Sequence, residues 1–83
     1  MFSQQSLIVL LQNHEIDADQ KLAIAVLRER ALRFAEAVVA YTKASPDQSA
    51  AIRHIREALW SANAAVSIYG IESVPPPIEP KID

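Results

Sequence analysis

Apolar residues recur at steps of three and four along two long stretches of the chain. In the first stretch they are Ile24, Leu27, Ala31, Phe34, Val38 and Tyr41. In the second they are Ile52, Ile55, Leu59, Ala62, Val66 and Tyr69. Such spacing keeps the side chains on one side of an α-helix and makes an apolar seam that another helix covers. The pattern predicts two long helices, at about residues 18–44 and 46–69.

The residues at the ends of these stretches match helix starts and a helix stop. Ser45 with Gln48, and likewise Asp17 with Gln20, have the spacing of a capping box. Gly70 suits the left-handed conformation that often follows the last helical turn. Because only a few residues near Ser45 join the two helices, we expect them to run antiparallel and form a hairpin.

A short apolar segment precedes the hairpin. Leu7, Ile8, Leu10 and Leu11 follow Ser3, a residue typical of a helix N-cap, and this predicts a helix of two or three turns at about residues 3–12. The run is also continuous enough for a short strand. We favour the helix because the rest of the chain offers no strand to pair with it.

The composition changes after Gly70. Residues 71–83, IESVPPPIEPKID, are rich in proline, which is incompatible with an α-helix and predicts an extended tail. Its apolar residues Val74, Ile78 and Ile82 fit either docking along a neighbour's groove or a free polyproline spacer. The predicted fold is all-α: a short N-terminal helix and a long antiparallel helical hairpin form a single domain at residues 1–70, and an extended Pro-rich tail follows.

Chain length and the width of the apolar face predict self-association. A chain of 83 residues buries only about 60% of its unfolded surface, so its own core is small. A second apolar stripe on the first long helix makes its apolar face wider than one partner helix can cover. Trp60 lies one position off the other seam, as an interface anchor does. The residues of the second stripe are Leu22, Ala25, Leu32 and Val39.

Charge and apolarity exclude several classes of partner. The formal net charge of −2 leaves no basic surface for duplex nucleic acid. The apolar run at residues 7–11 is far too short to span a membrane. The absence of cysteine excludes disulfides and thiolate metal sites. We therefore expect a cytoplasmic protein that binds neither a membrane nor duplex nucleic acid.

The chain offers little catalytic chemistry. It has only two histidines, His14 and His54, no cysteine and no Gly-rich phosphate loop, so we predict no enzyme activity, no cofactor and no metal site. Arg28 and Arg30 have no acidic residue three or four positions later, unlike a typical helix-surface ion pair. These arginines either lie on a solvated face or are available to bind phosphate.

The acids Glu29 and Glu36, in contrast, lie four residues before and three residues after Arg33, so we expect both to pair with it. In the second long helix, Asn63 interrupts a run of small residues and leaves one polar side chain where another backbone can approach closely. An asparagine at such a contact typically fixes the register of two helices.

The second long helix also carries a resemblance. The pattern S-P-x-x-Q-S-x-A-x-x-x-x-x-E-A-x-x-x-A-N-A-A resembles the C-terminal half of the helical hairpin in small phage proteins that sequester cyclic nucleotide signals. That family includes the second anti-CBASS protein and the first Thoeris anti-defence protein. The matching residues are Ser45, Pro46, Gln48, Ser49, Ala51, Glu57, Ala58, Ala62, Asn63, Ala64 and Ala65.

The resemblance implies a function. It implies a homohexamer whose inter-subunit pockets trap cyclic nucleotides, most readily cyclic dinucleotides, without cleaving them, so that a CBASS-type effector is not activated. It places Arg28 at a lysine position that pairs with phosphate and Asn13 at a stacking tyrosine position, with His14 as a substitute for stacking and Arg30 as a secondary donor. Ile68 stands where relatives that also bind cyclic trinucleotides have an arginine, so we expect weak or no trinucleotide binding.

A second function class remains open. The best-matched stretch consists mainly of packing residues, so the fold can be inherited without the pocket. The alternative is a non-catalytic helical oligomer or adaptor that binds a protein partner through its Pro-rich tail.

Overall fold

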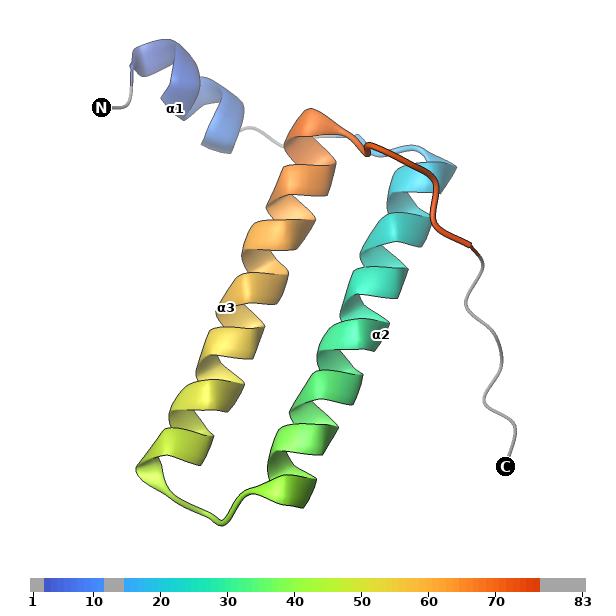
Figure 1. The fold of residues 1–83 in the computed structure, drawn as a ribbon. Coiled ribbons are helices and arrows are strands. Elements are labelled where there is room, and N and C mark those ends of the chain that lie inside the picture. Colours follow the sequence, from blue (N-terminus) through green and yellow to red (C-terminus); the bar gives the residue numbers. More distant parts are fainter. Residues whose placement is uncertain (1–2, 12–14, 77–83) are drawn as a thin grey trace.

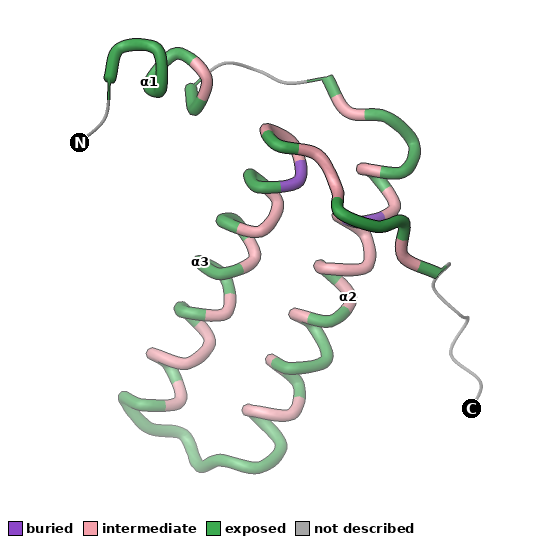
Figure 2. The backbone as a smooth tube through the Cα atoms, turned by 45° about the horizontal axis from the view of Figure 1, so that its top comes forward, coloured by how far each residue is buried: buried purple, intermediate pink, exposed green. Residues whose placement is uncertain are grey.

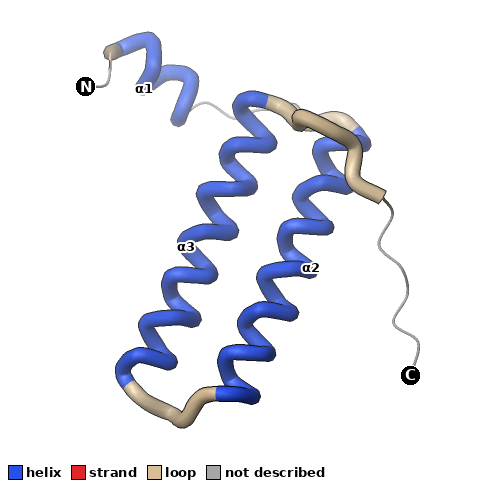
Figure 3. The backbone as a smooth tube through the Cα atoms, viewed as in Figure 1, coloured by secondary structure: helices blue, strands red, loops and turns tan. Residues whose placement is uncertain are grey.

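A computed structural model of the chain describes residues 3–11 and 15–76, and within these ranges it contains three helices and no strand (Figures 1 and 3). The helices are α1 (Gln4–Leu11), α2 (Ala18–Tyr41) and α3 (Pro46–Tyr69). Helices α2 and α3 lie side by side and antiparallel, and α1 lies apart from them near the open end of the hairpin (Figure 1). The predicted all-α class, short N-terminal helix and long hairpin are confirmed.

The starts of α1 and α2 follow the predicted cap chemistry. Ser3 Oγ accepts the backbone N–H of Ser6 at 3.1 Å. At α2 the capping box is complete, because Asp17 Oδ1 accepts the N–H of Gln20 at 2.8 Å and Gln20 Oε1 accepts the N–H of Asp17 at 2.9 Å. These bonds satisfy backbone donors that the first helical turn leaves free.

At α3 only half of the predicted capping box forms. Ser45 Oγ accepts the N–H of Gln48 at 3.1 Å, but the Gln48 side chain turns to the preceding loop instead. Its amide donates to the carbonyl and the hydroxyl oxygen of Thr42, at 3.2 and 3.1 Å. The same side chain therefore ties the start of α3 to the end of α2.

Helix α2 ends at Tyr41, three residues before the predicted end at residue 44. Thr42 is extended, with φ −125° and ψ 155°, and both its N–H and its Oγ1 donate to the Val38 carbonyl. The hydroxyl gives this carbonyl a second partner and stabilises the stop. The sequence contains no Gly or Pro here, so a prediction based on helix breakers extends α2 too far.

The hairpin has a thin core. Among the described residues only Ala23 and Val66 are buried, and most of the other residues on the facing sides of α2 and α3 are half-buried (Figure 2). Three seam residues are exposed rather than covered: Phe34 at 61%, Tyr41 at 87% and Tyr69 at 76%.

The exposure of Tyr41 is consistent with the mismatch between a heptad and a straight helix. Each residue turns the helix by 100°, so Tyr41 lies about 80° around the axis from Ala31. The sequence pattern predicted one continuous seam, but the far end of that seam rotates out of the contact with α3.

The open end of the hairpin is held by a long-range bond and by the chain after α3. Gln20 Nε2 donates to the Val66 carbonyl at 2.9 Å and joins the start of α2 to the end of α3. Gly70 has φ 86°, as predicted for a residue that ends a helix. The chain then crosses from α3 to α2 (Figure 1), where Ile71, Glu72, Ser73 and Pro75 help to line a depression of about 290 Å³. The described part of the tail thus lies on its own hairpin.

One copy exposes more surface than a compact protein does. Its radius of gyration is 15.7 Å, against about 12 Å for a compact chain of this length. Its accessible surface is 6919 Å², whereas a compact protein of 9.2 kDa exposes about 4,900 Å².

None of the helices in the described ranges combines the length and apolarity needed to cross a bilayer.

Candidate functional site

A shallow groove of about 490 Å³ runs between α2 and α3 along one side of the hairpin. Leucine, isoleucine and alanine side chains supply most of its lining, together with the half-exposed ring of Phe34. Two polar residues also line it, Arg30 from α2 and His54 from α3. We call this side of the molecule the groove face. Its apolar lining suits an apolar or aromatic occupant.

The two polar residues of the groove face differ in their partners. The Arg30 guanidinium is exposed and makes no ion pair or hydrogen bond with any described residue. His54 Nδ1 lies 3.6 Å from Glu57 Oε2, and both side chains are largely exposed. A separation of 3.6 Å between exposed groups is a weak interaction. Arg30 is therefore the cation on this face that is available to an anion.

Arg28 belongs to the other side of the hairpin. It precedes Arg30 by two residues, which places the two side chains about 200° apart around the axis of α2. Leu32 and Val39 follow Arg28 at helical steps and are also exposed. On α3, His54 and Arg56 flank Ile55 on two sides, so Arg56 lies away from the groove. We call the side with Arg28, Leu32, Val39, Arg56 and Trp60 the opposite face.

Like Arg30, Arg28 is exposed and has no ion-pair or hydrogen-bond partner among residues 3–11 and 15–76. Because the two arginines point to different faces, a single copy does not bring them into one pocket. A pocket that contains both needs a second copy of the chain. Asn13 and His14, the other two predicted ligand residues, lie outside the described residues.

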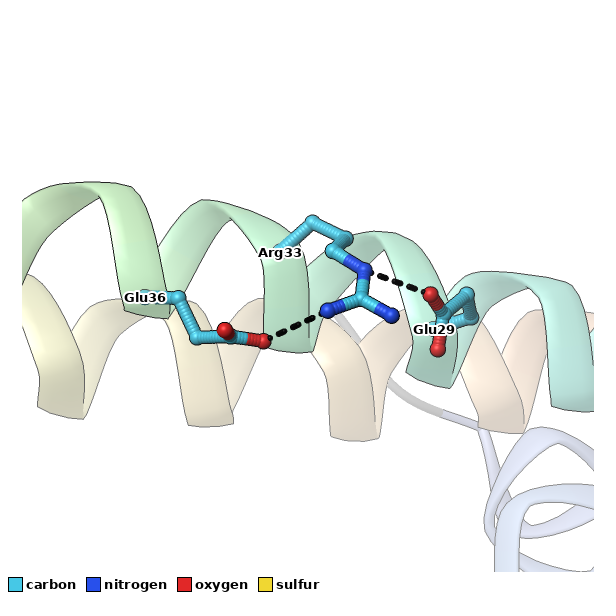
Figure 4. Close-up of polar contacts among 3 residues, drawn as sticks. All are labelled: Glu29, Arg33 and Glu36. Carbon is cyan, nitrogen blue, oxygen red and sulfur yellow. Dashed lines mark hydrogen bonds and ion pairs between the residues drawn. The ribbon is translucent and has the colours of Figure 1, made fainter. Parts of the chain in front are cut away.

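Arg33, unlike Arg28 and Arg30, forms ion pairs with two carboxylates of its own helix (Figure 4). Its Nε donates to Glu29 Oε1 at 2.7 Å and its NH1 nitrogen donates to Glu36 Oε1 at 2.9 Å, as predicted from their spacing. The guanidinium is thus neutralised by two carboxylates. Its charge is less available to a ligand than the charges of Arg28 and Arg30.

The opposite face carries the tryptophan. Trp60 is 55% exposed, and the Arg56 guanidinium carbon lies 4.4 Å from the centroid of its ring. This is a cation–π arrangement, which orders the indole without covering it. Trp60 is not a core residue of the single copy, and the prediction that it anchors an interface stays a prediction.

Asn63 is the unexplained polar residue of α3. Its Oδ1 atom is buried and has no hydrogen-bond partner in the described part of the chain. A buried acceptor without a donor costs stability. A donor from another copy would remove that cost, in line with the register role predicted for this residue.

Comparisons with protein-family models, curated proteins and solved structures found no match.

Both faces carry groups that can bind a ligand. Within the described ranges no group of three or more His, Cys, Asp or Glu side chains is placed to hold a metal ion. The available chemistry on the two faces includes the unpaired guanidinium groups of Arg28 and Arg30, which lie beside exposed apolar and aromatic side chains. Guanidinium binds phosphate through a fork of donors, and aromatic and apolar surfaces bind bases. The sequence pattern does not predict the groove, because it places Phe34 in the covered seam.

Proposed function

We propose that this chain is an anti-defence sponge that binds cyclic nucleotide immune signals, above all cyclic dinucleotides, without cleaving them. By holding the signal it denies a CBASS-type effector its activator in the host cytoplasm. Sequestration requires only affinity and enough copies of the binder, because bound ligand is removed from the free pool by mass action. The proposal rests first on the resemblance in α3.

The observation that carries the proposal is the state of Arg28. The residue occupies the position that the resemblance assigns to the phosphate ligand, and its guanidinium is exposed and unpaired among the described residues. Arg33, five residues later, is held by two carboxylates and serves as the internal contrast. A charged group kept free of neighbouring carboxylates can meet a phosphate without first breaking an ion pair.

The pockets are proposed to lie between copies. A cyclic dinucleotide has two phosphates, so a two-fold symmetric pocket could offer one Arg28 from each of two copies. The surface of a single copy supports association, because it exceeds that of a compact protein by about 2,000 Å², compared with about 800 Å² per partner in a standard interface. A hexamer is the assembly that the resemblance implies.

An adaptor that binds a protein partner through the Pro-rich tail is the alternative. Residues 71–75 lie on the hairpin of their own chain, so this alternative assigns the partner to the residues that follow. A chain truncated after Pro76 separates the two functions. A sponge keeps its nucleotide after this truncation, whereas an adaptor loses its protein partner.

The test is a binding and recovery experiment. The purified protein is incubated with a panel of cyclic di- and trinucleotides, separated from free ligand, and denatured by heat. We expect a cyclic dinucleotide to be retained and then released chemically unchanged. Recovery of a linear product would make the protein a hydrolase. Retention of no nucleotide would refute the sponge.

A further inference from the structure

Helix α1 presents an apolar surface that its own hairpin leaves uncovered. Its large apolar side chains are exposed, at 44% for Leu7, 52% for Ile8 and 82% for Leu11. The helix, QQSLIVLL, contains no charged residue. It lies beyond the open end of the hairpin (Figures 1 and 2), and none of its residues lines the groove. A solvated helix of eight residues gains little stability by itself, so α1 requires a surface to pack on.

The groove face is the second uncovered surface. Its lining is almost entirely apolar, and four of the lining residues are alanines, which leave room for another helix to approach closely. On α3 the groove extends from Ala51 to Ala62, a rise of about 16 Å. Helix α1 has eight residues and a length of about 12 Å. The groove is therefore long enough for α1.

We infer that α1 of one copy lies in the groove between α2 and α3 of a second copy, and that the second copy returns its α1 in the same way. The uncharged helix buries Leu7, Ile8 and Leu11 without removing any ionic group from water. The exposed side chains of Arg30 and His54 remain at the edge of the contact, where their polar ends stay solvated.

A second copy fits the surface area better than the chain's own α1 does. One chain exposes about 2,000 Å² more than a compact protein of its mass, whereas each partner in a standard interface buries about 800 Å². Folding α1 onto its own groove would leave Leu32, Val39 and Trp60 exposed on the opposite face. In a reciprocal exchange the contact between α1 and the groove forms twice, once in each direction. The second chain can also cover hairpin surface outside the groove.

This inference shares with the proposed function only the association of copies. It makes no use of a nucleotide, and the contact forms whether or not the chain binds one. The binding panel and the experiment below can therefore fail independently.

The test is disulfide trapping between two chains of different mass. The chain contains no cysteine, so a tagged Leu7→Cys variant can be mixed with untagged variants that each carry one cysteine. Ala51→Cys, Ala58→Cys and Ala62→Cys sample the groove, and Ala64→Cys, at an exposed site of α3 outside the groove lining, is the matched control. Refolding each mixture together lets the copies exchange.

We expect mild oxidation to give the mixed tagged–untagged dimer for at least one groove position and little of it for Ala64→Cys. A disulfide needs Cα atoms closer than about 7 Å, so trapping reports on proximity. Equal trapping at all four positions, or none at the three groove positions, would overturn the inference.

A second measurement uses no cysteine. Leu7→Gln removes an apolar side chain while keeping a good helix former, and it should weaken association about tenfold or more in sedimentation experiments. Gln4→Ala, at the exposed start of the same helix, is the control and should leave association unchanged. A Leu7→Gln protein with parental helicity and parental association would contradict the contact.

Discussion

The two faces of the hairpin both combine an arginine with apolar and aromatic side chains, but they differ in shape. The groove face combines an apolar channel with Arg30 and His54, whereas the opposite face places Arg28 among exposed Leu32, Val39 and an arginine-stacked tryptophan. Both faces offer an unpaired guanidinium next to uncovered apolar surface. The groove face is hollowed, and it suits a helix. The opposite face is a surface on which a second copy can complete a pocket around Arg28.

This difference has a practical consequence. Arg28 and Arg30 are two residues apart in sequence but lie on different faces, so a substitution at one leaves the surroundings of the other intact. Effects on assembly and on ligand binding can thus be separated within a single helix.

The largest effect is expected for Trp60→Ala. If the opposite face lies between copies, removing the indole takes away a large interface side chain, and such aromatic anchors contribute about 2–4 kcal/mol each. We expect light scattering to show dissociation to smaller species. Tyr41→Ala removes another exposed aromatic side chain near the hairpin turn and is the control, with assembly retained. A Trp60→Ala protein of parental mass would remove Trp60 from the interface.

Arg28→Ala is expected to have the next largest effect, on ligand binding rather than on assembly. A hydrogen-bonded charge contributes about 1.5–3 kcal/mol, so two copies of Arg28 in one pocket would together account for several kcal/mol. Titration calorimetry with the cyclic dinucleotide retained in the panel measures the loss. Arg28→Lys should lose less, because the charge remains while the fork of donors is lost.

Arg33→Ala is the matched control for Arg28→Ala. Arg33 lies on the same helix, but its guanidinium is already held by Glu29 and Glu36, so its removal should leave affinity near the parental value. An Arg28→Ala protein that stays assembled and binds as tightly as Arg33→Ala would place the phosphate site elsewhere.

Arg30→Ala should weaken binding less than Arg28→Ala. As a secondary donor on the groove face, Arg30 reaches the ligand only where another copy brings this face near the pocket. We expect a loss of about 1 kcal/mol in the same titration, typical of one hydrogen bond. If Arg30→Ala loses more binding free energy than Arg28→Ala, the groove face is the principal ligand surface and the opposite face is the secondary one.

The sequence predicted the elements of this fold better than their packing. Asp17 and Gln20 formed the predicted capping box, and Gly70 ended α3, because caps depend on residues a few positions apart. The end of α2 was wrong by three residues, since the Thr42 hydroxyl stops the helix without a Gly or Pro. The exposure of Tyr41 was also missed, because a heptad pattern does not show how far a straight helix rotates away from its partner.

The candidate site was less accessible to prediction than the fold. Spacing correctly singled out Arg28 and Arg30 as arginines without carboxylate partners and Arg33 as a paired one. That Arg28 and Arg30 lie on different faces follows from two residues of helical rotation and could have been predicted. The groove could not, because it depends on how α2 and α3 pack. The predicted contributions of Asn13 and His14 stay predictions.

The smallest effect is expected for Arg56→Gln on the opposite face. The guanidinium lies 4.4 Å from the centroid of the Trp60 ring, and a cation–π contact at an exposed site contributes about 0.5–1 kcal/mol. Glutamine keeps the helix propensity and part of the side-chain length, so the substitution removes mainly the charge over the ring. We expect tryptophan fluorescence to show a less ordered indole and thermal unfolding to show a small loss of stability.

Arg53→Gln removes an arginine from an exposed position of the same helix, and no cation–π contact joins Arg53 to Trp60. It should therefore change neither the fluorescence nor the stability. Pairing Arg56→Gln with Trp60→Ala completes the test, since the two losses should not add if the arginine acts through the ring. Additive losses would show that Arg56 stabilises the protein independently of the Trp60 ring.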